Sequence, residues 1–133
     1  MHTASSMKSR QRGLGMIGFL FMAGAFGVVV TLALKLIPAY IDYFTLKKIL
    51  VTISGDSSSA TKSNAELRED FSRRAKIDNV KVVTPEELVI DRSGGAPVIS
   101  VDYEYRAPLV ANVRLVVDFS ASSDPNATPA QVE

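Results

Sequence analysis

The sequence predicts an α+β fold. An N-terminal transmembrane helix continues into an amphipathic helix, a second helix follows, and a three- to four-stranded antiparallel meander completes the domain. Three observations support this prediction. Residues 14–34 contain no charged side chain, apolar residues then recur at helical spacing up to residue 53, and apolar and polar residues alternate later in the chain. Alternation of this kind is typical of half-buried strands.

The composition excludes several functional classes. The 133 residues include 15 basic and 14 acidic side chains, a formal net charge of +1. This balance gives no concentrated basic face, so we expect no nucleic-acid partner. The chain has no Cys, which excludes disulfides and thiolate metal sites.

Residues 14–35 form the predicted membrane anchor, because about 20 apolar residues are needed for a helix to cross the hydrocarbon core. A buried core helix of this length would need a larger protein around it. A cleaved signal peptide is the main alternative. Its apolar region normally covers only about 7–15 residues, and the best cleavage match, Thr31-Leu32-Ala33, is weak. We therefore expect a retained helix that contacts membrane lipid.

The charges that flank the anchor predict its orientation. Three cations and no acid precede the helix, whereas the cations after it are offset by Asp42: Lys8, Arg10 and Arg12 before, Lys35, Lys47 and Lys48 after. The positive-inside rule then places the N-terminus in the cytoplasm of a bacterium and the domain in the periplasm. The predicted parts are a cytoplasmic N-terminus (1–13), a transmembrane helix (14–35), a periplasmic α+β domain (36–120) and a disordered tail (121–133).

Small residues recur every four positions within the anchor, at Ala23, Gly27 and Thr31. They share one helix face, which a second helix could approach closely. The alternative is that Gly and Ala are simply common in membrane helices.

The helix is expected to continue over residues 35–53, with Pro38 able to kink it. Tyr40 and Tyr43 suit a membrane interface. We expect the apolar face of this segment to pack on the domain's own sheet rather than on a partner, since a small domain needs every apolar face it has. That face comprises Ile37, Tyr40, Ile41, Phe44, Ile49, Leu50 and Ile53.

A second helix is predicted over residues 64–76. Ser63 and Glu66 have the spacing of a capping box, and the expected buried stripe is Leu67, Phe71 and Ala75. Two ion pairs are expected on the outer face: Glu69 with Arg73, and Asp70 with Arg74. A solvated face is favoured over a docking surface.

Strands are expected in the last third of the chain. We predict an extended segment at 80–83, strands at 87–91, 99–106 and 112–119, a turn at Ser93-Gly94-Gly95 and a break at Ala107-Pro108. The polar residues from 121 onward predict the disordered tail.

The residues available for chemistry are few. The single His is His2, near the N-terminus, so neither a His metal site nor a Ser-His pair is expected within the domain. Lys47, Lys48 and several Ser residues do not have a spacing that supports a Ser–Lys dyad. Asp102 and Glu104 fit a solubilising face. We predict no enzyme activity, catalytic residue, cofactor, metal or small-molecule substrate.

Two resemblances extend these predictions. The stretch RGLGMIGF at residues 12–19 resembles the N-terminus of a type IV pilin or pseudopilin. That resemblance implies cleavage between Gly13 and Leu14 and a role as a structural subunit. Pilins usually have Glu at the fifth position of the mature chain, where this sequence has Gly18.

The second resemblance covers residues 8–120 and rests on QRGLGMIGFLF, ALKLIPAYIDYF and VDYEYRAPLVANVRLVVDF. These stretches are similar to a proteobacterial family of uncharacterised short membrane proteins, domain of unknown function 4845. Its genes commonly lie beside that for signal peptidase I, which implies a link to protein export. The resemblance implies no catalytic residues. The expected function is an inner-membrane accessory or scaffold protein with a protein partner in the envelope, such as signal peptidase I; the alternative is a pseudopilin-like subunit.

Overall fold

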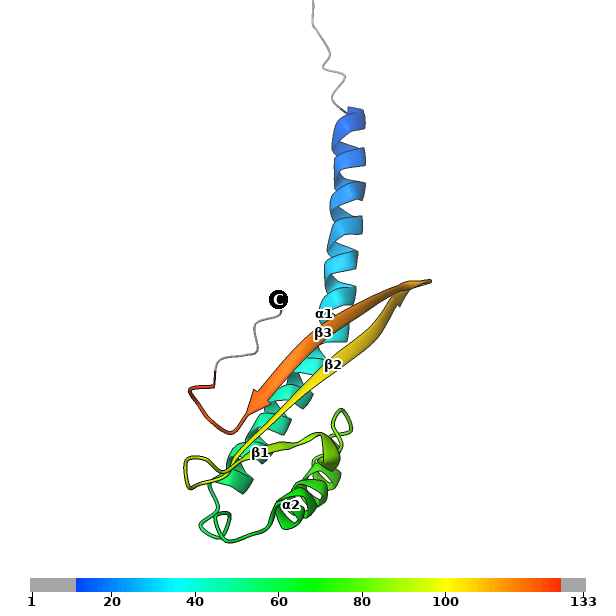
Figure 1. The fold of residues 1–133 in the computed structure, drawn as a ribbon. Coiled ribbons are helices and arrows are strands. Elements are labelled where there is room, and N and C mark those ends of the chain that lie inside the picture. Colours follow the sequence, from blue (N-terminus) through cyan, green and yellow to red (C-terminus); the bar gives the residue numbers. More distant parts are fainter. Residues whose placement is uncertain (1–11, 128–133) are drawn as a thin grey trace, which may run out of the picture. The chain divides into compact units, whose positions relative to one another are not determined.

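The computed structural model describes the backbone of residues 12–127 and the side chains of residues 15–127. The elements, in chain order, are α1 (Arg12–Ser54), α2 (Asn64–Ile77), the short 3-10 helix η1 (Pro85–Glu87), β1 (Val89–Asp91), β2 (Val98–Val110) and β3 (Val113–Ser122) (Figure 1). The predicted α+β fold and its element order are confirmed.

Helix α1 belongs to two units of the chain, which divide between Lys35 and Leu36. The helix is continuous across this boundary and through Pro38, as predicted. In the first unit, the described side chains of residues 15–31 are all exposed. In the second unit, α1 supplies part of a folded core.

The core of the second unit forms where residues 46–53 of α1 meet α2 and the sheet. Leu46, Ile49, Leu50 and Ile53 have helical spacing and are at most 3% exposed, so they form one apolar stripe. The other core residues come from later elements and include Leu67, Phe71, Ala75, Ile99, Val101, Tyr103, Phe119 and Ala121. Packing of α1 on the domain itself is confirmed for Ile49, Leu50 and Ile53, whereas Ile37, Ile41 and Phe44 remain exposed.

The predicted capping box starts α2. The Ser63 hydroxyl accepts a hydrogen bond from the Glu66 amide at 3.3 Å, and the Glu66 carboxylate accepts one from the Ser63 amide at 2.6 Å. These bonds satisfy two amides that the helix itself leaves free. Hydrogen bonds from Ser63 also lower the pKa of Glu66 below its ordinary value.

One of the two predicted ion pairs on α2 is present. Arg73 bonds Glu69 at 2.6 Å. The prediction for Asp70 and Arg74 is wrong, because Lys62 reaches Asp70 at 2.7 Å instead. Lys62 lies just before α2, so its side chain reaches Asp70 from the preceding loop rather than from a position four residues away on the helix.

The sheet is an antiparallel meander with strand order β1-β2-β3. In register, Ile90 faces Ile99, and Tyr103 faces Phe119. The strand predicted at 87–91 begins only at Val89, because Pro85 starts the 3-10 turn and the Glu87 carboxylate caps the Thr84 amide at 2.7 Å. Residues 80–83 form no strand, although Val80 and Val83 are buried.

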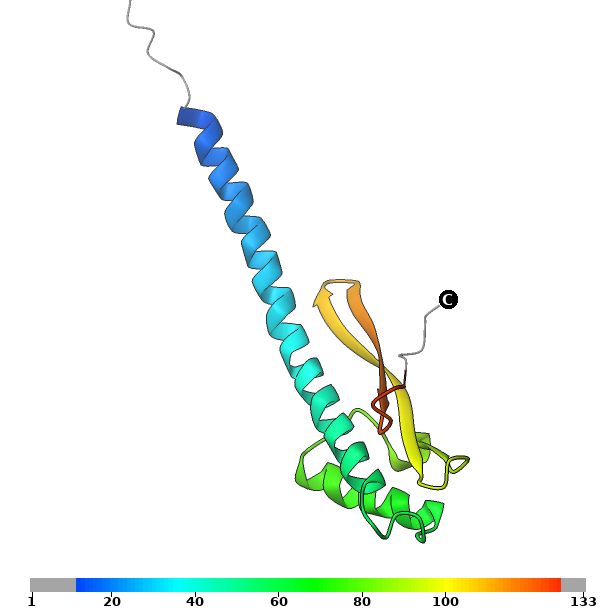
Figure 2. The same cartoon turned by 90° about the vertical axis from the view of Figure 1, so that its left-hand side faces the viewer.

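The prediction that Ala107-Pro108 breaks the strand is wrong. Strand β2 continues to Val110, with Pro108 facing Arg114 and a register shift between Pro108 and Val110. Strand β1 pairs only with residues 98–100, so β2 is an edge strand at Pro108. Proline, which lacks an amide hydrogen, is tolerated at such an edge. The result is a hairpin that extends away from α2 (Figure 2).

The predicted tail begins too early. Strand β3 continues to Ser122, and Ala121 is fully buried opposite Val101. The Ser123 amide also donates a 2.9 Å hydrogen bond to the Ile99 carbonyl. The sequence prediction ended the strand too early because Ala and Ser do not show the alternation of large apolar and polar side chains that marks a strand. Such small side chains nevertheless fit where two chain segments pack closely. The final residues of the predicted tail, 128–133, lie outside the described residues.

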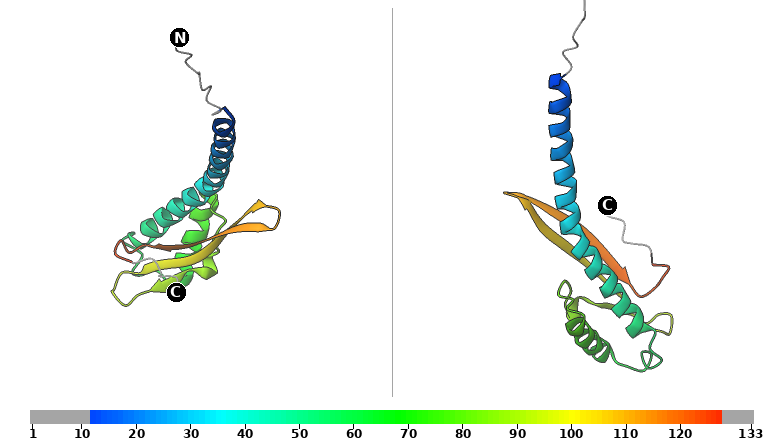
Figure 3. Two further views of the ribbon diagram at one scale, coloured as in Figure 1. Left: turned by 90° about the horizontal axis from the view of Figure 1, so that it is seen from above. Right: turned by 180° about the vertical axis from the view of Figure 1, so that it is seen from behind.

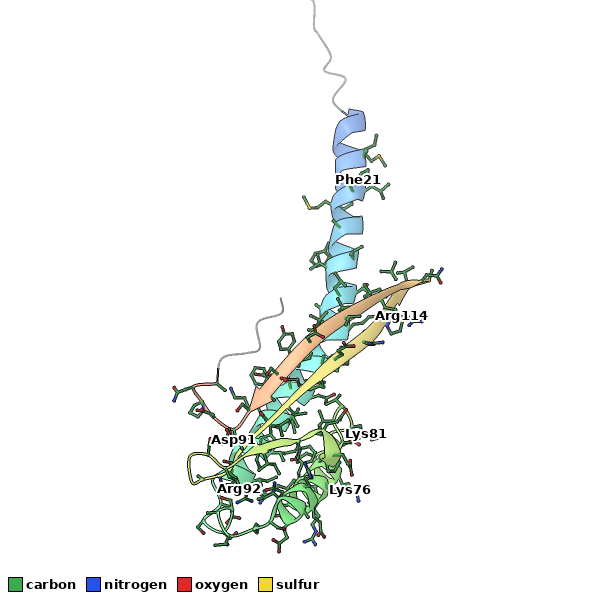
Figure 4. The ribbon with its side chains drawn as sticks, viewed as in Figure 1. Phe21, Lys76, Lys81, Asp91, Arg92 and Arg114 are labelled. Carbon is green, nitrogen blue, oxygen red and sulfur yellow. The ribbon has the colours of Figure 1, made fainter. Side chains whose placement is uncertain are left out.

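Arg92 has a structural role that sequence reasoning missed. Its guanidinium donates hydrogen bonds to the Asn64 side chain at 2.8 Å, the Lys62 carbonyl at 2.5 Å and the Ala60 carbonyl at 3.3 Å. Arg92 therefore joins the segment after β1 to the start of α2 and the loop before it. Figure 4 labels Arg92 beside Asp91.

Candidate functional site

Among the residues that the structure describes, α1 is the one helix long and apolar enough to cross a membrane. Its side chains from residue 15 to residue 31 are exposed and uncharged, as Phe21 illustrates in Figure 4. Exposed apolar side chains on every face of a helix are compatible with a lipid environment. A secretory signal sequence near an N-terminus has the same character. The chain therefore has a segment suited to membrane anchoring.

The predicted small-residue face lies within this segment. Ala23, Gly27 and Thr31 are all exposed, and a Cβ atom added at Gly27 would meet no other atom within 4 Å. The Thr31 hydroxyl donates a 2.8 Å hydrogen bond to the Gly27 carbonyl of the same helix, so the hydroxyl has a partner within its own helix. The face is open, and a packing role for it remains a prediction.

The predicted cleavage position lies at the start of α1. Gly13 and Leu14 are in the first turn of the helix, and their side chains lie outside the described residues, as do Lys8 and Arg10. Processing at this position stays a prediction.

Four aromatic rings join the second part of α1 to the hairpin. Phe119 on β3 contacts Tyr40 edge-on with ring centroids 5.5 Å apart, and it stacks on Tyr43 and Tyr103 at 5.4 Å each. Such ring pairs add stabilisation beyond their burial. Tyr40 and Tyr43, which the sequence suggested for a membrane interface, thus also hold the hairpin against the helix.

The contacts along α1 define the direction in which the hairpin lies. The Ser54 hydroxyl donates a hydrogen bond to the Pro97 carbonyl at 2.5 Å, just before β2 begins. Further along β2, Tyr103 stacks on its partner Phe119, and Phe119 lies against Tyr40 and Tyr43. The order of these contacts shows that β2 is antiparallel to the second part of α1, so the C-terminal end of β2 lies toward Leu36. The hairpin turn lies at the end of the folded unit where α1 enters it, and Figure 3 shows the hairpin in two further views.

Exposed apolar side chains gather at this same end. We define the proximal apolar surface as Ile37, Ile41 and Phe44 on α1 together with Val110, Val113 and Val116 on the hairpin, all of which are more than half exposed. With Tyr40, they are seven of the ten large apolar side chains that are exposed in residues 36–127. Sequence reasoning missed the hairpin part, because it placed a break at Pro108. The signal available was the run of apolar residues on both sides of the turn, with Val110 before it and Val113 and Val116 after it.

The charges near the hairpin turn are basic. Arg106 and Arg114 are the charged residues between positions 106 and 116. Glu104 accepts a 2.9 Å hydrogen bond from the Nε atom of Arg106, whereas Arg114 lies closer to the turn. Figure 4 shows Arg114 near the end of the hairpin and Lys76 and Lys81 at the opposite end of the folded unit.

Among the described residues, the side chains that the sequence offered for catalysis do not form a catalytic arrangement. Lys47 lines a small cleft with Ser120 and Ser122, but no hydrogen bond joins these three described side chains. Within the described part of the chain, no group of three or more His, Asp or Glu side chains is placed to hold a metal ion. Asp102 and Glu104 are exposed on the outer face of β2.

One buried polar group lies among the aromatic rings. The Tyr103 side chain is 8% exposed, and its hydroxyl has no hydrogen-bond partner among the described residues. Burial, the charge of Asp42 and the neighbouring Tyr43 raise the pKa of Tyr103 to about 12. The hydroxyl is therefore neutral at physiological pH, and it is not an activated acid or base there.

The comparisons with known proteins identify a family without a defined activity. The family model described as Domain of unknown function (DUF4845) matches residues 35–119, which extend from the end of the apolar segment into β3. No curated protein and no solved structure matches the chain at a significant level.

Proposed function

This chain belongs to the DUF4845 family of domains of unknown function, and we propose that it is a non-enzymatic, inner-membrane-anchored accessory or scaffold protein with a periplasmic interaction domain. The observation that carries the proposal is the continuity of α1 (Arg12–Ser54). Its apolar first part suits a bilayer, and its second part supplies Leu46 and Leu50 to the domain core. No loop separates anchor from domain, so such a helix would keep the domain at the membrane.

The flanking charges support the orientation in this proposal. Lys8, Arg10 and Arg12 precede the apolar segment without any acid, which favours a cytoplasmic N-terminus and a periplasmic domain. A reporter fused after the C-terminus would test this orientation: periplasmic alkaline phosphatase should be active there, and a fused β-galactosidase should be inactive. The reverse pattern would contradict a periplasmic domain.

The proposed partner is a protein of the bacterial envelope, and signal peptidase I is the first candidate because of the family resemblance. Affinity purification of the tagged full chain in mild detergent tests this. We expect reproducible recovery of one envelope complex. Recovery of the chain alone would contradict an accessory role.

The small-residue face offers a matched pair of variants for the same purification. Gly27→Leu would fill the face shared with Ala23 and Thr31 and should reduce partner recovery if a partner helix packs there. Gly18→Leu adds the same side chain about two and a half turns away, on the opposite face of the helix, and both glycines have open space for it. Equal recovery with the two variants would exclude this face from the contact.

A pseudopilin-like structural subunit is the second candidate. Its support is the Arg12-Gly13 pair at the start of a long continuous helix whose first part is exposed. Mass spectrometry of the mature protein would decide between the two candidates. Cleavage between Gly13 and Leu14 would support the structural subunit, whereas an intact chain that begins at Met1 or Met7 would rule out prepilin processing.

A further inference from the structure

We propose that the proximal apolar surface contacts the bilayer, with the end of the β2–β3 hairpin in the headgroup region of the lipid. This inference deepens the proposed function and rests on its membrane anchor, but not on any protein partner. The hairpin would then be a second membrane contact of the domain, in addition to α1.

The first argument is the concentration of exposed apolar side chains at one end of the folded unit. Single exposed apolar residues are normal on protein surfaces, but a large share of them gathered at one end of a folded unit indicates a site of interaction with protein or membrane. Val110 and Val113 are 72% and 59% exposed, on either side of the hairpin turn. On α1, Ile37, Ile41 and Phe44 are spaced to lie on one face and are 53–63% exposed.

The second argument is the position of this surface within the folded unit. Leu36 is where the apolar segment joins the unit, and the hairpin turn lies at that same end. From Tyr103, the strand extends about 23 Å to Val110 at about 3.3 Å per residue. From Tyr40 to Leu36, α1 advances only about 6 Å at 1.5 Å per residue. The hairpin is therefore long enough to reach the end of the unit that adjoins the anchor.

The third argument is chemical and favours lipid over a second protein. A bilayer that holds residues 15–35 is already present where Leu36 begins, so lipid can cover both the helix and hairpin parts of the surface. Arg114 places a cation next to the exposed valines, and basic side chains near apolar ones suit the headgroup boundary of a bilayer.

The absence of Trp from the chain allows a specific test. The full chain, with Val113→Trp as its single Trp, is reconstituted into vesicles of phosphatidylethanolamine and phosphatidylglycerol. Val89→Trp is the matched control, because Val89 is also an exposed strand valine (62% exposed) but pairs with Ser100, near the Ser54 end of the unit. Val110→Trp is a second probe, should Val113→Trp fail to fold.

We expect the Trp emission of Val113→Trp to shift to the blue in the vesicles. The emission should also lose intensity when the lipids carry brominated acyl chains. The emission of Val89→Trp should be quenched by aqueous acrylamide and unaffected by brominated lipid. A hairpin probe that acrylamide quenches and brominated lipid does not would overturn the inference. A hairpin probe could instead be protected from acrylamide but not quenched by brominated lipid. If that protection is lost as the chain is diluted in lipid, a second copy of the chain covers this surface, and the inference is overturned.

Co-flotation with the vesicles separates this inference from the proposed function. If the chain floats but brominated lipid does not quench the Trp, the membrane anchor is supported and the hairpin contact is refuted. A chain that does not float refutes both. A failed partner purification leaves the lipid result unaffected, because the reconstituted vesicles contain no other protein.

Discussion

At the residue scale, the Tyr103 hydroxyl combines good packing with an unmet hydrogen bond. Its ring stacks on Phe119, while the hydroxyl is buried with no partner among the described residues. A buried polar group without a partner costs about 1–3 kcal/mol. The ring stabilises the junction between α1 and the hairpin, and its hydroxyl opposes that stabilisation.

Tyr103→Phe should therefore increase the free energy of unfolding, by about 1 kcal/mol, because it keeps the stacked ring and removes the unsatisfied hydroxyl. Urea unfolding of the full chain in mild detergent, followed by circular dichroism, measures the change. Tyr105→Phe, two positions along β2 at a partly buried residue, is the comparison and should not match the gain. A loss of stability in Tyr103→Phe would show that the hydroxyl has a partner in solution.

The raised pKa of Tyr103 predicts a loss of stability at alkaline pH. Tyrosine in an unfolded chain ionises near pH 10, whereas burial first, and then the charge of Asp42, raise the pKa of Tyr103 to about 12 in the fold. The folded state thus binds this proton more tightly, so its contribution is complete below pH 10 and declines as the pH rises toward 12. Unfolding measured across this range should show a smaller alkaline loss for Tyr103→Phe than for the natural chain. Identical profiles would contradict the assigned shift.

At the element scale, α2 shows how a short local motif sets a helix boundary. Ser63 and Glu66 satisfy each other's backbone amides at the start of α2, and this geometry requires only the spacing of the two residues along the chain. Arg92 then connects the segment after β1 to the helix start through hydrogen bonds to Asn64 at 2.8 Å and Lys62 at 2.5 Å. The first motif is local, and the second set is not.

Ser63→Ala should lower the free energy of unfolding by about 1 kcal/mol, because it removes the N-cap acceptor for the Glu66 amide. Ser72→Ala is the matched control, since it makes the same change inside α2, where Ala is the better helix former. Thermal unfolding of both variants in the same detergent compares them. An equal loss in the two variants would mean that the cap contributes nothing specific.

At the scale of the whole molecule, the core joins α1, α2 and the sheet through a few large side chains. Phe71 is fully buried on α2 and lies in the same core as Leu46 and Leu50 of α1. Since a small domain has a total stability of only about 5–15 kcal/mol, each such side chain carries a large fraction of it.

Phe71→Ala should destabilise the folded unit by about 3–5 kcal/mol through lost burial and the cavity left behind. Ile77→Ala provides the control, because Ile77 belongs to the same helix and is 82% exposed. Its change should stay within about 0.5 kcal/mol. Urea midpoints for the two variants check this, and similar midpoints would contradict the assigned core.

The sequence by itself predicted the features that depend on local order. Helix α1 follows from apolar residues at helical spacing, the start of α2 from Ser63 and Glu66, and the buried face of β2 from alternation at Ile99, Val101 and Tyr103. All of these depend on residues a few positions apart, so their periodicity and capping can be read along the chain. The open small-residue face at Ala23, Gly27 and Thr31 was equally readable, although its role stays a prediction.

The tertiary structure decided the features that depend on distant neighbours. Pro108 could remain in β2 because β1 pairs only with residues 98–100 of that strand, and Ala121 joined β3 because Val101 lies opposite it. Asp70 paired with Lys62 rather than Arg74. The proximal apolar surface likewise exists only because the hairpin lies along α1 with its turn at the Leu36 end. Pairing and burial depend on which segments meet in space, and spacing along the chain does not contain that information.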